Sequence, residues 1–334
     1  MNIPEQNWEA ISVTYDVITL GETMLRLSPP DLLRIEQSTR YEAHVGGSES
    51  NVAVGLARLG LRVAWVSRMT DNAVGHSIVN AIRAHGVDTS YVVWTDQDRV
   101  GLYFYEAGSD PRSGRVIYDR AGSAAARIQP SDLPADILTS ESARLLHLSG
   151  ITLALGESAA QTAHRIARLA KQHGWLLSFD INYRQLLWSA QTARSGCHEL
   201  ASIADILFLP LRDAINLYAA SADPEAAVSQ MHELYPNATV VMTLGADGAI
   251  AQSGDTVTKQ PVYPAATIDR VGGGDSFVAG YLFGHLTGSS VTESLRWGAA
   301  SAAYKYSMVG DMPLLDLAPI RQLVDQVQRQ GLVR

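Results

Sequence analysis

Three consecutive glycines stand directly before an acidic residue in the C-terminal part of the chain. Gly272, Gly273 and Gly274 precede Asp275, and the residues that follow have an apolar pattern of helical period. Glycines at a helix N-terminus expose backbone N–H groups, which bind an anion together with the helix dipole. Asp275 is either an N-cap carboxylate or a base that takes a proton from a hydroxyl attacking a bound phosphate. Dinucleotide binding is less favoured, because the final glycine of G-x-G-x-x-G is absent.

A second glycine-rich junction lies near the N-terminus. Gly46 and Gly47 precede a helical pattern that starts with small polar residues and ends at Gly60, which suits a helix C-cap. Asn51, on the first turn of this helix, could hydrogen-bond a polyol that approaches the bare backbone of Gly47. The junction therefore predicts either a sugar contact or an ordinary tight turn into a helix.

Together the two junctions resemble the signatures of one enzyme family. The segment 46–60 resembles the N-terminal signature of the ribokinase-like (PfkB-type) sugar kinases. The segment 269–280 resembles their C-terminal signature, D-x-x-G-A-G-D-x-F-x-x-G, with Gly273 in place of the usual alanine. The resemblance extends over nearly the whole chain. It implies phosphorylation of a sugar hydroxyl by ATP, with Asp275 as the base and the backbone of Gly272, Gly273, Gly274 and Asp275 as the anion hole.

Within this family the chain is most similar to the 2-keto-3-deoxygluconate kinases, notably in the segments 115–124, 146–151 and 180–188. This similarity implies transfer to a terminal hydroxyl of a 2-keto-3-deoxy sugar acid, which gives the 6-phosphate. The rigid forks of Arg120 and Arg184 suit the substrate carboxylate. The implied sugar-acid pocket consists of Gly47, Asn51, Tyr103, Tyr118, Arg120, Ile151, Arg184, Asp275 and Asp311.

Two alternatives stay open. Fructokinases share the D-x-N-x-R pattern of segment 180–184, so a fructokinase or another neutral-sugar kinase is the alternative within the family. A catalytically silent sensor that binds a sugar or a nucleotide is the alternative from another class, although the presence of Asp275 and the three glycines argues against it.

The resemblance also implies ATP and Mg²⁺ as cofactors. Many relatives have N-x-x-E where this chain has Pro210 and Asp213, so Asp213 is the candidate metal contact, through water. Some relatives bind a monovalent cation near the position of Asp269, which makes K⁺ a candidate ligand here. The implied nucleotide-binding residues are Asn182, Arg184, Thr243, Gly245, Gly248, Gly273 and Gly274.

The scaffold that positions these residues is readable from hydrophobic periodicity. Strand-length apolar runs alternate with helix-like stretches, which is typical of a parallel sheet covered by helices on both faces. We expect an α/β fold of three layers, ribokinase-like, formed by residues 1–334 as one domain. Residues of about 22–45 and 98–120 alternate with period two, which predicts a small antiparallel β lid. If lid strands pair between subunits, the chain forms a homo-oligomer.

Composition disfavours several other classes of protein. The chain has 334 residues, 46% of them hydrophobic, and a net charge of −8, which argues against a nucleic-acid partner. It contains no apolar run long enough to span a membrane and no basic segment followed by an apolar leader, so we expect a cytoplasmic protein without a membrane partner. The histidines and the single cysteine lack metal-ligand spacing.

Overall fold

The computed structural model describes residues 14–139 and 141–331. Among these residues, nine strands form one sheet in the order β13–β12–β11–β10–β9–β8–β1–β4–β5. Neighbouring strands from β11 to β5 are parallel, whereas β12 and β13 are antiparallel and form one edge. The expected, mostly parallel α/β sheet is confirmed. Its strands are β1 (Tyr15–Leu20), β4 (Val63–Thr70), β5 (Val92–Thr95), β8 (Ala143–Ser149), β9 (Leu176–Asp180), β10 (Ile206–Pro210), β11 (Thr239–Thr243), β12 (Ala249–Ser253) and β13 (Thr256–Gln260).

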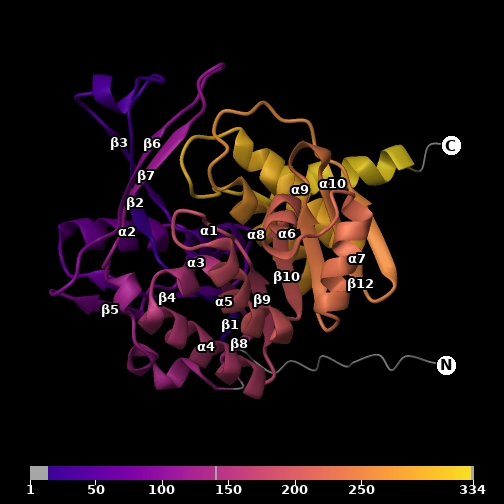
Figure 1. Cartoon of the computed structure of the whole chain (residues 1–334), viewed down its shortest axis with the longest axis horizontal. Helices are drawn as coiled ribbons and strands as arrows, with labels where there is room; N and C mark the ends of the chain where they lie inside the picture. Colours follow the sequence, from indigo (N-terminus) through magenta and orange to yellow (C-terminus); the bar gives the residue numbers. More distant parts are fainter. Residues whose placement is uncertain (1–13, 140, 332–334) are drawn as a thin grey trace.

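Helices cover both faces of this sheet (Figure 1). Consecutive strand residues point to opposite faces, so Val17 belongs to one apolar core and Ile18 to the other. The first core contains side chains of α1 (Ser48–Arg58), α2 (Ala73–Arg83), α8 (Gly273–Leu286), α9 (Val291–Tyr306) and α10 (Leu317–Gly331). The second contains side chains of α3 (Gly150–Ala154), α4 (Glu157–Gln172), α5 (Ala190–Ile203), α6 (Leu211–Tyr218) and α7 (Pro224–Leu234).

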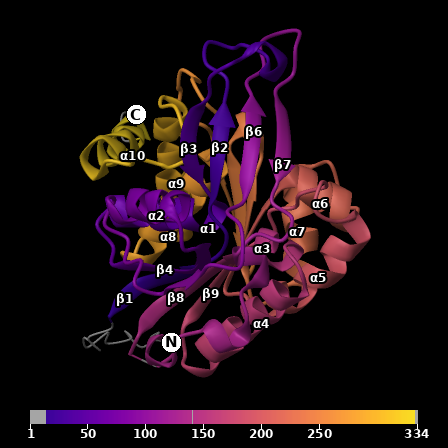
Figure 2. The ribbon, with the colours of Figure 1, turned by 90° about the vertical axis from the view of Figure 1, so that its left-hand side faces the viewer.

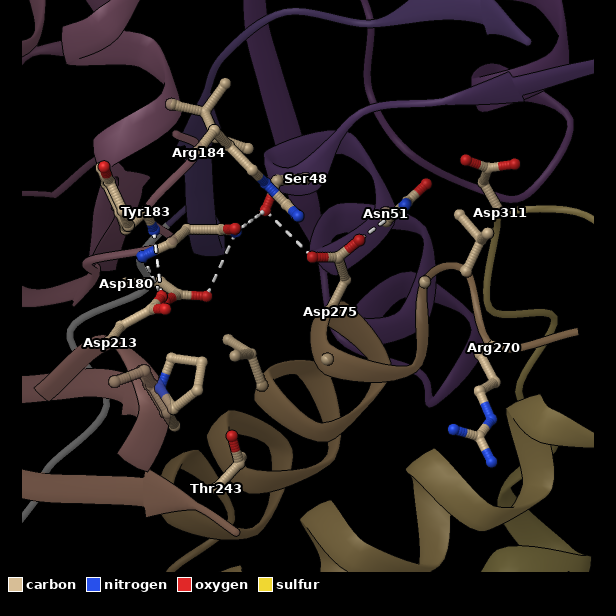
Figure 3. Close-up of a pocket in the computed structure, with 18 of the residues that line it drawn as sticks. Ser48, Asn51, Asp180, Tyr183, Arg184, Asp213, Thr243, Arg270, Asp275 and Asp311 are labelled. Carbon is tan, nitrogen blue, oxygen red and sulfur yellow. Dashed lines mark hydrogen bonds between the residues drawn. The ribbon is translucent and has the colours of Figure 1, made fainter. Parts of the chain in front are cut away.

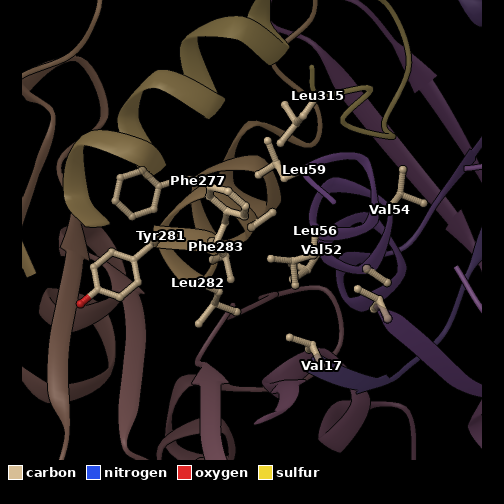
Figure 4. Packing of buried hydrophobic residues seen from close by; sticks show 14 of the residues in the cluster. Val17, Val52, Val54, Leu56, Leu59, Phe277, Tyr281, Leu282, Phe283 and Leu315 are labelled. Atoms are coloured by element: carbon tan, nitrogen blue, oxygen red, sulfur yellow. The ribbon is translucent and has the colours of Figure 1, made fainter. Parts of the chain in front are cut away.

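Helices α1 and α8 pack against each other in the first core, as Figure 4 shows. Leu56 of α1 and Leu282 of α8 belong to the same buried cluster. The two backbones approach closely, since a Cβ atom added to Gly55 would lie 2.7 Å from the Cβ of Ala279. Both helices begin at the glycine-rich junctions, so this packing brings the two junctions together.

A second sheet stands at the carboxyl edge of the main sheet (Figure 2). Within the described residues it has four strands in the order β3–β2–β6–β7. These are β2 (Met24–Ser28), β3 (Glu42–Gly46), β6 (Leu102–Glu106) and β7 (Arg115–Asp119), which lie at or near the two expected lid segments.

The expectation of an antiparallel lid is wrong for one strand pair. Strand β2 pairs with β6 in parallel, while β2–β3 and β6–β7 are antiparallel, so the lid sheet is mixed. The reason lies in the connections. Strand β2 follows β1 and strand β6 follows β5, and these two strands of the main sheet run in the same direction.

Short 3₁₀ turns complete the regular structure, at Ile35–Gln37, Ala125–Arg127, Pro130–Asp132, Ala135–Ile137 and Gly245–Asp247. In the part of the chain that is described, no helix combines the length and the apolar character needed to cross a membrane.

Candidate active site

A cavity of about 970 Å³ lies between the carboxyl ends of the main-sheet strands and the lid. Its main-sheet side is lined by Asp180 at the end of β9, Pro210 at the end of β10 and Thr243 at the end of β11. Tyr103 and Tyr118 line it from the lid strands. Open α/β sheets bind ligands at the carboxyl ends of their strands, so this cavity is the candidate active site.

Asp275 lies on the first turn of α8 and points toward the first turn of α1 (Figure 3). Its Oδ2 accepts a hydrogen bond of 2.7 Å from Asn51 Nδ2, and its Oδ1 accepts one of 3.0 Å from Ser48 Oγ. Burial raises the pKa of Asp275, whereas Asn51, Arg184 and Ser48 act in the opposite direction. A carboxylate with a raised pKa, held in a fixed orientation beside a cavity, can accept a proton near neutral pH.

The glycines before Asp275 form the N-terminus of α8. Gly272 has φ of +78°, and a Cβ there would lie 2.0 Å from the carbonyl oxygen of Asp311, so only glycine fits. Within the described residues, the backbone N–H groups of Gly274 and Asp275 have no acceptor. These free donors and the positive end of the helix dipole can bind an anion in the cavity.

A side chain at position 273 would meet the ring of Tyr306. A Cβ atom on Gly273 would lie 2.3 Å from Cε1 of Tyr306, which also lines the cavity. An alanine at this position therefore requires the tyrosine ring to move.

On the lid side, Arg120 does not stand alone. Its Nε donates a hydrogen bond of 2.8 Å to Glu22, its Nη2 contacts the same carboxylate oxygen, and its guanidinium lies 5.5 Å from the ring centroid of Tyr118. Nη1 makes no hydrogen bond with any described residue. The Tyr103 hydroxyl donates to the carboxylate of Asp311, next to the backbone of Gly46.

Arg184 is different from Arg120. It follows β9, and its exposed side chain makes no hydrogen bond or ion pair with the described residues. It lies near enough to Asp180, Asp213 and Asp275 to affect the pKa of each of them. Arg184 is thus a guanidinium that is free to bind an anionic ligand.

A group of acidic residues lines the cavity beneath Arg184. Burial and the charge of Asp275 raise the pKa of Asp180 to about 8. Burial also raises the pKa of Asp213, whose oxygens accept hydrogen bonds from Arg212 Nε at 3.1 Å and from the Tyr183 N–H at 3.3 Å.

Asn182 connects this acidic group to Asp275. It has φ of +40°, and its Nδ2 donates to Ser48 Oγ at 2.8 Å, which in turn donates to Asp275.

The other predicted residues divide between the cavity and its surroundings. Gly47, Ile151, Thr243 and Gly245 line the cavity with the residues already described. Gly248 does not line it. Gly248 has φ of +97°, and a Cβ there would lie 2.0 Å from the carbonyl oxygen of Gln260, so this glycine is required by the turn before β12. Gly273 does not line it either, although its neighbours Gly272 and Gly274 do, so the cavity brings together all the predicted sugar-side and nucleotide-side residues except Gly248 and Gly273.

Comparison with known proteins places the chain in a family. The profile of the pfkB family carbohydrate kinases matches residues 15–316. The chain belongs to this family. The kinase is 40% identical over 303 residues to a 2-dehydro-3-deoxygalactonokinase of Haloferax volcanii, with 91% of this chain and 94% of that protein covered.

Solved structures show the same fold. The crystal structure of 2-dehydro-3-deoxygluconokinase from Thermotoga maritima is 30% identical, has a TM-score of 0.88 and covers 93% of the kinase and 98% of its own chain. An Escherichia coli structure determined with ATP and Mg²⁺ is 19% identical, has a TM-score of 0.84 and covers 93% and 99% of the two chains.

The acidic residues fit a Mg²⁺ ion that keeps most of its water. Among the described residues of the kinase, no group of three His, Cys, Asp or Glu side chains could hold a metal ion by itself. Mg²⁺ usually binds through one or two carboxylates together with substrate phosphates and water. Asp180 and Asp213 offer such oxygens beside the cavity, and a cation there would favour the ionised form of Asp180, which burial and the charge of Asp275 disfavour.

Several residues of the site were not singled out from the sequence. Ser48, Glu22 and Asp180 touch or line the cavity, as does the exposed Arg270 before the glycines. Asp180 had a readable signal, because it stands at the carboxyl end of an apolar strand. Glu22 had none, since its partner Arg120 lies far away in the sequence.

Proposed function

We propose that this kinase transfers the γ-phosphoryl group of Mg²⁺-bound ATP to the terminal hydroxyl of a 2-keto-3-deoxy sugar acid, either the gluconate or its galacto epimer. One observation carries the acid part of this proposal: Arg120 and Arg184 line the same cavity as Asp275. The names of the Haloferax volcanii and Thermotoga maritima proteins described above support the same substrate class.

Asp275 acts as the general base in this proposal. The sugar hydroxyl oxygen forms a bond to the γ-phosphorus while the bond from that phosphorus to the β–γ bridging oxygen breaks, and the hydroxyl proton passes to Asp275. Asn51 and Ser48 hold the carboxylate in position through the bonds to its two oxygens. Positioning of this kind is the main contribution a protein can make to phosphoryl transfer.

The N-terminus of α8 stabilises the charge that develops on the transferred group. The free N–H groups of Gly274 and Asp275 lie in the first turn of α8, which also carries the Asp275 carboxylate. Asp180 and Asp213 would hold a hydrated Mg²⁺, which neutralises charge on the phosphates. Thr243 and Gly245 border the same cavity at the end of β11 and would contact the nucleotide.

The substrate carboxylate is recognised by the two arginines. Arg184 has no acidic partner among the described residues, so a carboxylate there would gain a charge-assisted hydrogen bond without displacing one. Arg120 is held by Glu22 and Tyr118 and offers Nη1. Tyr103, Tyr118 and Ile151 would surround the carbon chain of the sugar from the lid and from α3.

The deciding experiment compares kcat/KM for 2-keto-3-deoxygluconate, 2-keto-3-deoxygalactonate and fructose. We expect wild type to prefer the acids, and we expect Arg184→Leu to lower kcat/KM for the acids by about 10-fold to 150-fold, the loss of a charged hydrogen bond of about 1.5–3 kcal/mol. Turnover of fructose should fall much less. Arg168→Leu, an exposed arginine on α4 paired with Glu199, is the matched control.

The same measurements separate the alternatives. A preference for fructose in wild type, or an equal loss with acid and neutral sugar in Arg184→Leu, would favour the neutral-sugar kinase. Absence of turnover with every sugar, combined with saturable binding of one of them, would favour a sensor.

A further inference from the structure

Asp269, where the family resemblance allows a K⁺ ion, is already surrounded by donors from the kinase itself. It is buried, with 8% of its surface exposed. Its Oδ1 accepts a hydrogen bond of 3.0 Å from the Val271 N–H. Its Oδ2 accepts one of 2.9 Å from Arg26 Nη2 and one of 3.2 Å from the Gly310 N–H. A carboxylate has about four lone-pair positions, so little of its acceptor capacity is left for a cation.

Lys305 is a second buried cationic side chain in this region, and it forms no ion pair within 4.0 Å with a described carboxylate. It lies in the last turn of α9 with none of its surface exposed, and its Nζ donates a hydrogen bond of 3.2 Å to the carbonyl oxygen of Met308. Burial lowers the pKa of Lys305, whereas the charges of Asp269 and Asp311 act in the opposite direction.

The nearby backbone carbonyls are also engaged. The Met308 oxygen accepts from Lys305, the Tyr306 oxygen accepts from the Ile268 N–H at 2.7 Å, and the Lys305 oxygen accepts from the Met308 N–H at 3.1 Å. A potassium site needs several oxygens that can replace its hydration shell. The oxygens of Lys305, Tyr306 and Met308 already accept hydrogen bonds from N–H groups of the kinase, so these three carbonyls and Asp269 do not fit a K⁺ ion.

The buried charges balance without an added ion. Arg26 Nη1 also forms an ion pair of 2.9 Å with Asp311 Oδ1, so Arg26 bridges the two carboxylates, and Lys305 lies near enough for both to affect its pKa. Each of the four residues has 8% or less of its surface exposed. A K⁺ ion bound among Arg26, Lys305, Asp269 and Asp311 would give these buried residues a net positive charge, which is energetically costly. We propose that Arg26 and Lys305 together take the place of a monovalent cation, so that the kinase turns over without one.

Arg26 links the anion hole to both buried carboxylates. Asp269 binds the N–H of Val271, the residue before Gly272, and Arg26 joins Asp269 to Asp311. The carbonyl of Asp311 lies directly against Gly272. Arg26 lies on lid strand β2. Its ion pairs with Asp269 and Asp311 therefore connect the lid to the anion hole and to the 308–311 loop. Arg26 and Lys305 act as positioning residues.

The first test uses the unmodified kinase. Its kcat is measured in potassium, sodium and tetramethylammonium chloride, each at about 0.1 M so that ionic screening is equal. We expect values that agree within about twofold, and a melting temperature that does not rise in potassium, because a cation bound only by the folded state would raise it. Activation by potassium of about 10-fold or more over tetramethylammonium would overturn the proposal.

The second test removes the ammonium group in two ways. Lys305→Ala leaves space that K⁺ or NH₄⁺ could enter, whereas Lys305→Met fills the space without charge. We expect both variants to lose about 10-fold or more in kcat in tetramethylammonium, and only Lys305→Ala to regain activity in potassium or ammonium chloride. Lys259→Ala, an exposed lysine paired with Glu225, is the control.

If Lys305 had only a structural role, Lys305→Ala and Lys305→Met would not differ in their response to potassium or ammonium. If Lys305→Ala is as active as wild type in tetramethylammonium, or if both variants respond alike to potassium, the assignment of Lys305 is wrong. If Lys305→Ala does not fold, the comparison of salts on wild type still decides whether a soluble cation is required.

Discussion

The hydrogen bond from Ser48 to Asp275 offers a direct test of the base. Ser48 Oγ donates to Asp275 Oδ1 at 3.0 Å, while Asn51 donates to the other oxygen at 2.7 Å. Ser48→Ala removes the first bond and leaves the second. Because a hydrogen bond to the ionised form lowers the pKa of a carboxyl group, its loss raises the pKa of Asp275. The ionised form is the active base. As the pH is lowered, Ser48→Ala should therefore lose activity at a higher pH than wild type does.

The size of the effect follows from the bond and its surroundings. A hydrogen bond to a charged group contributes about 1.5–3 kcal/mol. Asp275 is partly exposed to the cavity, so a water molecule can replace part of the lost hydrogen-bond energy. The net loss in Ser48→Ala is then about 1 kcal/mol. On the acidic side of the pH profile, kcat/KM should therefore fall by about fivefold relative to wild type. On the plateau at higher pH, where Asp275 is ionised in both proteins, kcat/KM should change little.

The assay is kcat/KM with a saturating concentration of Mg²⁺-bound ATP, measured across the acidic limb and the plateau. Ser50→Ala is the control, because Ser50 is buried in the same turn of α1 but bonds to Thr23 and Gly47 rather than to Asp275. An acidic limb that stays in place in Ser48→Ala would refute the role of Asp275 as the ionising base. A uniform loss at every pH would mean that Ser48 binds substrate instead of tuning the carboxylate.

Three further perturbations test the surrounding structure. Gly273→Ala should lower both kcat and the melting temperature, because the new Cβ would lie 2.3 Å from the Tyr306 ring, and Tyr306→Ala in the same chain should restore most of the loss; failure of this rescue would refute the steric explanation. Binding of Mg²⁺-bound ATP at pH 7 should release a proton, because a nearby cation lowers the pKa of Asp180 from about 8. Calorimetry in buffers of different ionisation enthalpy measures this proton release, and Asp180→Asn should abolish it. Glu22→Gln should lower the free energy of unfolding in urea by about 3 kcal/mol, because it leaves the buried Arg120 without its counter-charge; Glu199→Gln, in an exposed pair with Arg168, should cost about 1 kcal/mol or less.

The sequence could predict the features that depend on local pattern. Apolar runs alternating with helical periods indicate a covered parallel sheet, because the burial of each strand on both faces is visible in the strand itself. The two glycine-rich junctions indicate helix N-termini, and Gly272 confirms the reason, since its φ of +78° and the adjoining carbonyl of Asp311 exclude a side chain. Asp275 could be named from its place beside these glycines.

Relationships between distant segments could not be predicted in this way. The lid pairs β2 with β6 in parallel because both continue strands of the main sheet, which no local alternation reveals. Arg120 could be identified as a cation of the site, but its pairing with Glu22 depends on where the ends of β1 and β7 meet. The burial of Arg26 between Asp269 and Asp311 likewise depends on segments far apart in the sequence.

The division has one physical cause. Backbone conformation and amphipathic period are properties of a few neighbouring residues, so composition and spacing determine the strands, the helix starts and the exposed amides at the start of α8. The environment of an ionisable group depends on charges and donors within a few ångströms, which the packing of α1 against α8 brings from elsewhere in the chain. Only that packing brings Asn51 and Ser48 within hydrogen-bond distance of Asp275, and only the tertiary structure buries Lys305 and pairs Arg26 with Asp269.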